Sequence, residues 1–133
     1  MPLNKDRNTP MQDGELVAVP VAAGVEIFAG SLVVADATGY AAPGSEADDV
    51  TYLGRAEEHV DNADGDDGDV SVRVRRGKAF KWANSGTDPI DQAGLGQTCF
   101  IEDDETVSAT DNTGARSAAG TVIQIDDDGV WVQ

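Results

Sequence analysis

The sequence predicts an all-β protein, a small barrel or sandwich with few or no helices. Its apolar runs are short, rich in valine and interrupted by glycines, which is the pattern of many short strands joined by turns. No segment sustains an apolar period of about 3.6 residues over three helical turns. Turn-forming tetrapeptides such as DATG at 36–39 and DNTG at 111–114 separate the runs.

The clearest strand pattern is VSVRVR at 70–75, where valines alternate with polar residues, so one face packs inward and the other carries charge. Gly77 then predicts a bulge or bend before Phe80. A single helical turn is expected over Pro89–Gly94, with Asp88 as its start signal. The expected strands are Leu16–Pro20, Leu32–Ala35, Tyr40–Ala41, Val50–Val60, Val70–Trp82, Thr98–Glu102, Thr121–Asp126 and Val130–Gln133.

The 133 residues suffice for one domain, which we place at residues 14–133. Residues 1–13 are polar, contain two prolines, and predict an extended N-terminal arm that is poorly packed, or disordered when the protein is free. With only seven aromatic residues, the core should be thin and built of valine. A thin core makes burial against partners an attractive source of stability.

The formal net charge of −16 comes from 25 acidic and nine basic residues and argues against binding to nucleic acid or to anionic membranes. Solubility and adaptation to high salt are simpler readings of the same acidity. The first residues lack the apolar run of a signal peptide, and no stretch approaches the roughly 18 apolar residues of a membrane span. We therefore expect a protein of the cytoplasm until a larger assembly carries it out.

Few residues suggest chemistry, so we expect no enzyme and no cofactor. His59 is the only histidine, no catalytic triad or metal-ligand spacing surrounds it, and Cys99 in TCFI suggests a buried structural thiol. The acidic loop DNADGDDGD at 61–69 raises a calcium hypothesis, but its glycines do not fit the EF-hand register. A solvated hairpin loop is the preferred interpretation, with a weak cation site of another kind as the alternative.

Basic residues gather in one place. Five of the nine lie within nine positions, which leaves four basic against 25 acidic residues elsewhere; the five are Arg73, Arg75, Arg76, Lys78 and Lys81. This stripe predicts either an interface with a second copy or an acidic partner, or internal charge balance with loops such as 61–69. Nucleic-acid binding through the stripe is a distant third reading, because the surrounding acidic field opposes it.

Several blocks of the sequence, taken in order, resemble the capsid cement proteins of tailed-phage head operons. These blocks are KDRNTP, DGELVAVPVAAGVEIFAGSLVVADATGYAAPG, YLGRAEEHVDN, GDVSVRVRRGKAFKWANS, IEDDETV and AAGTVIQIDDDGVWVQ, and they cover almost the whole chain. The resemblance implies a compact β-barrel or β-tulip-like domain, as in lambda-type head decoration proteins. It also implies binding as a homo-trimer to the outer surface of the expanded capsid, with the polar arm ordered on the major capsid protein.

From the residues and the resemblance together we expect a structural decoration protein that cements a phage head. The expected contact residues lie in the arm and the basic strand: Leu3, Asn4, Lys5, Arg7, Arg73, Arg75 and Arg76. An alternative is a carbohydrate or cell-surface binding module displayed on the virion, suggested by Tyr40, Trp82, Trp131 and the acidic loops. Both tryptophans follow strand patterns, however, so core packing is the better expectation for them.

Overall fold

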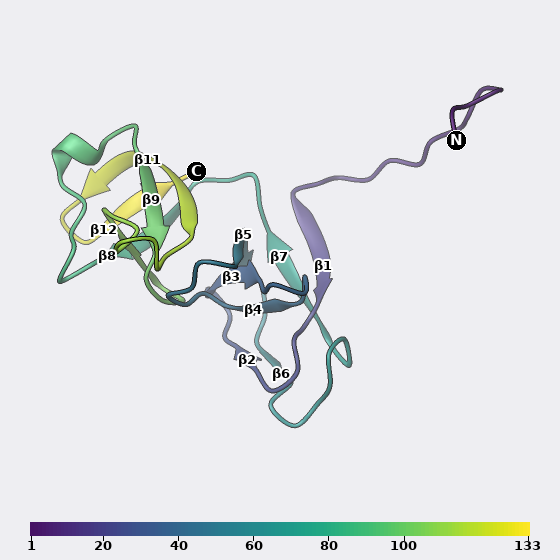
Figure 1. Ribbon diagram of the computed structural model, residues 1–133, viewed down its shortest axis with the longest axis horizontal. Coiled ribbons are helices and arrows are strands. Elements are labelled where there is room, and N and C mark those ends of the chain that lie inside the picture. The colour runs from purple at the N-terminus through teal and green to yellow at the C-terminus, as the bar shows by residue number, and fades with distance from the viewer.

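The computed structural model covers residues 1–133 and contains twelve strands, one short 3-10 helix and no α-helix, which confirms the all-β prediction. The strands form two main bodies, a five-stranded sheet and a closed five-stranded barrel, which lie beside each other (Figure 1). No helix in the fold has the length and apolarity needed to cross a membrane.

The first body is an antiparallel sheet of order β1-β7-β5-β3-β4. Its strands are β1 (Leu16–Pro20), β3 (Leu32–Ala35), β4 (Ala41–Pro43), β5 (Thr51–Ala56) and β7 (Ser71–Arg75). A two-stranded ribbon, β2 (Glu26–Ile27) with β6 (Val60–Asp61), lies at the end of the sheet opposite the start of the arm (Figure 1). Strand β1 is therefore an outer strand with one neighbour.

The second body is a closed barrel of order β10-β8-β12-β11-β9, in which only β8 and β10 run parallel. Its strands are β8 (Phe80–Asn84), β9 (Thr98–Ile101), β10 (Thr106–Ser108), β11 (Ala118–Asp126) and β12 (Gly129–Val132). Closure leaves no unpaired strand edge in this body. The expected small β-barrel is therefore present.

The apolar core is divided into two clusters that meet at β3. Leu32 and Val34 of β3 belong to the larger cluster, which fills the barrel, whereas Val33 between them belongs to the cluster of the sheet and ribbon. Alternation along a strand explains this division, because successive side chains point to opposite faces. Valine dominates both clusters, as the composition predicted.

The boundaries of β1 and β3 match the predicted ranges, but two longer predictions were wrong in extent. The predicted strand Val50–Val60 is divided into β5 and β6, and Val70–Trp82 into β7 of the sheet and β8 of the barrel. The second break follows from Gly77, whose φ of 74° is in the left-handed region and turns the chain from one body to the other. The bend expected at Gly77 is thus the link between the two bodies.

Smaller elements also differ from prediction. Strands β2 and β10 were not expected, since two or three residues carry too little alternation to detect. The predicted turn at Pro89–Gly94 reduces to a 3-10 helix over Gln92–Gly94. Its N-cap is Asp91, which accepts a hydrogen bond from the backbone N–H of Ala93. Asp88 instead accepts hydrogen bonds from Thr110.

Candidate interaction surface

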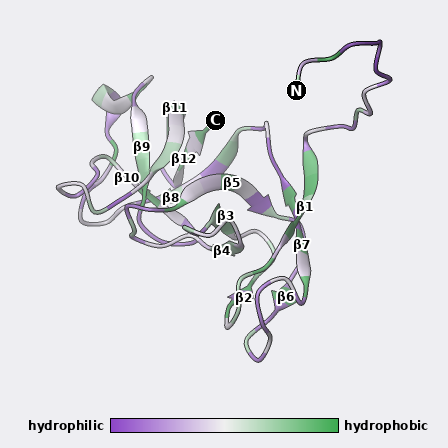
Figure 2. Ribbon diagram, turned by 45° about the vertical axis from the view of Figure 1, so that its right-hand side comes forward, coloured by the Kyte–Doolittle hydropathy of each residue, from purple (hydrophilic) through white to green (hydrophobic).

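The N-terminal arm, residues 1–13, has no strand or helix and extends away from the sheet (Figures 1 and 2). No hydrogen bond or ion pair joins residues 1–12 to the rest of the chain, and the Arg7 guanidinium donates only to the Thr9 hydroxyl, at 2.7 Å. Leu3 is 72% exposed, and Asn4 and Lys5 are also exposed. The four arm residues predicted for contact are therefore all available to a partner.

The arm leads directly into β1, whose outer edge is unpaired. Arg76 donates its backbone N–H to the carbonyl of Glu15, and Val21 donates to Val70, so the odd-numbered residues of β1 bond to β7. Antiparallel alternation then turns the N–H and C=O groups of Leu16 and Ala18 away from β7. A further extended segment can add to the sheet at this edge.

Two arginines of the predicted basic strand are paired within the chain. Arg73 contacts the Glu58 carboxylate at 3.1 Å, and Arg75 contacts Glu57 at 2.6 Å. These hydrogen bonds lower the pKa values of both glutamates. Internal charge balance was one of the two predicted interpretations of the basic stripe. The carboxylates that balance Arg73 and Arg75 belong to the β5–β6 connection, however, and not to the loop at 61–69 that was given as an example.

Arg76 differs from its neighbours, because its side chain is exposed and has no carboxylate partner. The next basic residue, Lys78, contacts Glu15 at 3.1 Å, and Glu15 immediately precedes β1. The base of the arm is thus attached to the basic end of β7 by a backbone hydrogen bond and an ion pair. The structure therefore places the point where the arm leaves the domain beside the basic end of β7, whereas Leu3, Asn4, Lys5 and Arg7 extend away from Arg73, Arg75 and Arg76 (Figure 1).

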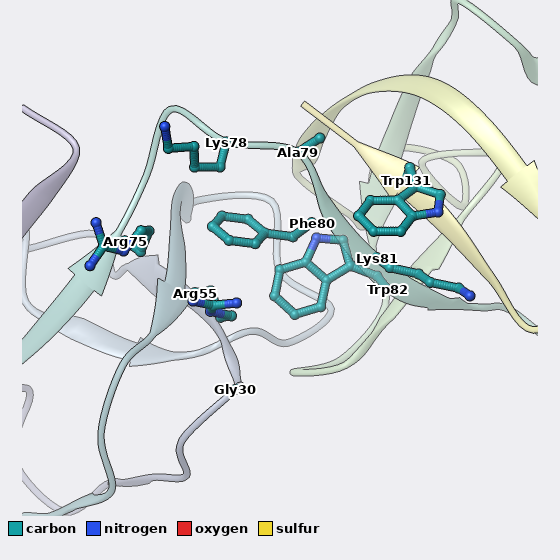
Figure 3. A pocket seen from close by; sticks show the side chains of 9 residues that line it. All are labelled: Gly30, Arg55, Arg75, Lys78, Ala79, Phe80, Lys81, Trp82 and Trp131. Atoms are coloured by element: carbon teal, nitrogen blue, oxygen red, sulfur yellow. The ribbon is translucent and has the colours of Figure 1, made fainter.

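Arg55, Arg75 and Lys78 also line one side of a cleft of about 450 Å³ between the sheet and the barrel (Figure 3). Phe80 lies in the middle, and the Arg55 guanidinium lies 4.9 Å from the centre of its ring. Gly30 lines the cleft as well, and the space where its side chain would lie is open. We call this feature the cationic cleft; no local pattern in the sequence predicts it, because its lining comes from four separated segments of the chain.

The opposite side of the cationic cleft contains both tryptophans (Figure 3). Trp82 is buried in the barrel core, and its indole N–H has no hydrogen-bond partner. Trp131 is half-buried, donates to Asp126 at 2.8 Å, and has the Lys81 ammonium 6.0 Å from its ring centre. Lys81 itself contacts Asp126 and Asp128, and the hydrogen bond that its ammonium donates to Asp128 contributes most to raising its pKa. Neither indole presents a wide free face.

The loop at 61–69 is exposed and held in shape by its own residues. Asn62 is buried and donates to the carbonyls of Ala22 and Asp66 at 2.9 and 3.0 Å. The carboxylates of Asp67 and Asp69 accept only backbone N–H groups, and none in the loop contacts a lysine or arginine. No three histidine, cysteine or acidic side chains are grouped in a way that could hold a metal ion.

An exposed aromatic residue was overlooked in the sequence. Phe28 is 57% exposed and stacks on His59, with ring centres 5.0 Å apart. His59 also contacts Glu26 at 2.8 Å. Alternation in VEIF at 25–28, with Ile27 buried between Glu26 and Phe28, was the signal that could have placed this ring on the surface.

Cys99 lies in the barrel core, where it is 1% exposed. Burial raises the pKa of its thiol to about 11. A thiol in that state is poorly nucleophilic near neutral pH. Its position agrees with the structural role expected from TCFI.

Comparison of the chain with models of protein families, with curated protein sequences and with solved structures found no match.

Proposed function

We propose that this protein is a capsid decoration, or cement, protein that binds the outer surface of a tailed-phage head and stabilises the expanded shell. It would act as a structural component of the virion, made in the host cytoplasm and added to the head during assembly. The proposed partner is the major capsid protein, with three copies associating as a homo-trimer on the shell. No cofactor and no catalytic step are part of the proposal.

The observation that carries the proposal is the exposed arm and its attachment beside an unpaired strand edge. The arm offers the backbone groups of residues 1–13, together with Leu3, Asn4, Lys5 and Arg7, to a second surface. The edge of β1 and the free guanidinium of Arg76 lie at its base. A segment of this kind can cross joints between capsid subunits and pair with their strands.

Weak contacts that are repeated by symmetry suit a protein that stabilises a capsid. Ordering the arm costs conformational entropy, so one arm supplies modest net binding. Symmetric repetition and a trimer multiply the contacts, because each bound copy holds the others close to their sites. Binding only to the expanded shell would follow if expansion completes the site, and free protein would then not interfere with assembly.

Sugar binding by the aromatic residues is less well supported. Stacking on a sugar needs a broad exposed aromatic face, whereas Trp82 is buried and Trp131 and Tyr40 are half-buried. The net charge of −16 likewise disfavours nucleic acid and anionic membrane as partners.

The test uses purified protein with expanded and unexpanded shells of the phage that encodes it. The full chain should co-sediment with expanded shells and not with unexpanded ones, and removal of residues 1–13 should abolish binding. Electron microscopy of decorated shells should show the protein at threefold or quasi-threefold positions, with the arm on the shell. Failure of the full chain to bind either shell would overturn the proposal.

The full-length double variant K5A/R7A should bind shells with an affinity between those of the original chain and of the chain without residues 1–13. It keeps the backbone of the arm and removes its two cations, so it should bind expanded shells more weakly and with less dependence on salt. If this variant bound as tightly as the original, the contact would rest on backbone and apolar groups alone.

A further inference from the structure

Opposite charges are collected at the two ends of β7 and do not meet within the chain. The acidic loop at 61–69 precedes Ser71, the first residue of β7, and the basic residues Arg76 and Lys78 follow Arg75, the last. A five-residue strand rises by about 3.3 Å per residue, so the strand alone separates the two groups by roughly 13 Å. Figure 1 shows the loop and the connection from β7 to β8 at opposite ends of the sheet.

The basic end has more cations than carboxylates to pair with them. Arg55 and Arg75 share the single carboxylate of Glu57, at 3.0 and 2.6 Å. Lys78 has Glu15, and Arg76 has none. This end of β7 therefore has four cations and two carboxylates, within a protein whose net charge is strongly negative; Arg55, Arg75 and Lys78 line the cationic cleft, and Arg76 lies next to Arg75 in the chain.

The acidic loop has the reverse imbalance, because five aspartates lie between residues 61 and 69 with no basic residue among them. Asp64 and Asp66 are exposed, and their side chains accept no hydrogen bond. The buried amide of Asn62 and the tight approach of Gly65 to it hold the loop in one shape, so its charges are presented in a fixed arrangement. A preorganised loop loses less entropy on binding than a mobile one.

We propose that the acidic loop of one copy docks at the cationic cleft of a second copy of the same chain. This inference builds on the homo-trimer of the proposed function and names the surfaces that join its subunits. Carboxylates of the loop would enter beside Arg75 and Lys78, where Gly30 leaves the cleft open, and the unpaired Arg76 next to Arg75 would add its charge at the edge of the contact. Arginine is suited to this contact because its planar guanidinium can donate two parallel hydrogen bonds to one carboxylate.

A contact between two different surfaces of the same chain is head-to-tail. An open chain of docked copies keeps one free loop at one end and one free cleft at the other, so association continues until a ring closes. A closed ring of three satisfies every loop and every cleft. Strong net repulsion between copies is limited to short range at about 0.15 M salt, where the Debye length is about 8 Å.

Charge reversal tests the contact. R76E/K78E reverses the cleft, and D64K/D66K reverses the loop, in both cases at exposed positions. Each pair should raise the dissociation constant for self-association on the order of tenfold or more, since like charges then face each other. The combined variant R76E/K78E/D64K/D66K has the original net charge and opposite charges at every contact, so it should associate again. Sedimentation velocity over a range of concentrations measures all four proteins, and circular dichroism checks their folding.

The matched control is D111K/D127K, which changes the net charge as D64K/D66K does but at exposed aspartates outside the loop. Association of this control should be at least as strong as that of the original chain. The inference is overturned if the original chain is monomeric throughout, if either reversed pair associates normally, if the combined variant stays dissociated, or if the control dissociates too.

Binding of the same variants to expanded shells separates this inference from the proposed function. If R76E/K78E loses shell binding while its self-association is unchanged, the cleft contacts the capsid, the self-docking inference is wrong and the cement proposal stands. If the charge pattern governs self-association but neither the original chain nor any variant binds shells, the docking contact stands and the cement proposal fails.

Discussion

A Cβ atom on Gly54 would lie 2.1 Å from the backbone carbonyl oxygen of Arg75. The two residues belong to β5 and β7, and their close approach places Arg55 beside Arg75 across the sheet. Both guanidinium groups can then reach the Glu57 carboxylate. The mouth of the cationic cleft therefore depends on a glycine that is itself outside the cleft.

Replacement of Gly54 with alanine should destabilise the fold by at least about 2 kcal/mol. Its φ of 151° is unfavourable for any side chain, and the added methyl group would have to displace the backbone of β7. Urea denaturation measures the change, and G14A is the control, because Gly14 has no positive φ and open space around it. Equal stability of G54A and the original protein would show that β5 and β7 can separate at this point.

Arg116 joins two loops of the barrel to the β4–β5 loop of the sheet, and R116M should destabilise the protein by about 2–3 kcal/mol. Its side chain is 9% exposed and contacts Glu46, Asp88 and Glu102 at 3.2, 3.2 and 3.4 Å. Methionine keeps much of the volume but leaves three carboxylates together without a cation. R116K keeps the charge and loses the planar fork, so its unfolding free energy should lie between those of R116M and the original.

Stability should fall in acid, and R116M should weaken this dependence. Hydrogen bonds from Thr110 and Asn112, followed by the effects of Arg116, lower the pKa values of Asp88 and Glu46 from their ordinary 3.8 and 4.5. Carboxyl groups with a lowered pKa in the folded state contribute stability that is present above the unfolded pKa and is lost as the pH falls through the folded one. Urea midpoints should be level from about pH 7 to 5 and then decrease toward pH 3, less steeply in R116M. A midpoint that rises on acidification would contradict this.

Short-range sequence patterns were enough to predict the short strands that are rich in valine and bounded by turn residues. Short valine-rich runs between turn residues placed β1 and β3 correctly, and Gly77 marked the point where the chain leaves the sheet. Closure of the barrel depends on β8 pairing with β12, which starts some 50 residues later, so alternation within one segment carried no information about it.

The sequence was enough to predict which basic residues form the candidate surface, but not which acidic residues they contact. The run of basic residues identified Arg73, Arg75 and Arg76, but their acidic neighbours depend on how β5 and β7 pair. The dense aspartate loop at 61–69 looked like the natural partner, although it lies at the other end of the strand. The position of Glu15 beside Lys78, which connects the arm to the basic end, follows from the β1–β7 register and has no local signal.

Deletion of residues 1–13 should leave the unfolding free energy within about 0.5 kcal/mol of the original value. Residues 1–12 make no hydrogen bond or ion pair with the domain, and the large apolar side chains of the arm are exposed. Urea denaturation of the shortened chain measures this independently of any shell. A loss of more than about 1 kcal/mol would mean that the domain begins earlier than residue 14.

Cys99 should react with thiol reagents only when the barrel opens. At pH 8 its thiol is almost fully protonated and buried, because burial raises its pKa to about 11. The rate of labelling should increase by orders of magnitude in urea and follow the unfolding transition. A raised thiol pKa contributes stability below the unfolded pKa, and this contribution is lost as the pH rises through the folded value. Rapid labelling of the native protein at pH 8 would place the thiol at the surface.

The turn at Asn112 and Thr113 contains the remaining backbone strain. Thr113 has a φ of 59°, a left-handed conformation that β-branched side chains adopt rarely, and its hydroxyl makes no hydrogen bond. Asparagine tolerates this conformation better, so T113N should stabilise the protein by about 0.5–1 kcal/mol. The comparison variant is T38N, because the Thr38 hydroxyl donates a hydrogen bond to Asp36 that asparagine would disturb. T38N should therefore lower the free energy of unfolding. Thr110 is less suitable for this comparison, because its hydroxyl bonds to Asp88, which also contacts Arg116. Because Thr113 contacts neither Arg116 nor the carboxylates that Arg116 binds, T113N should raise the urea midpoint at neutral pH and leave the pH at which those contacts are lost unchanged.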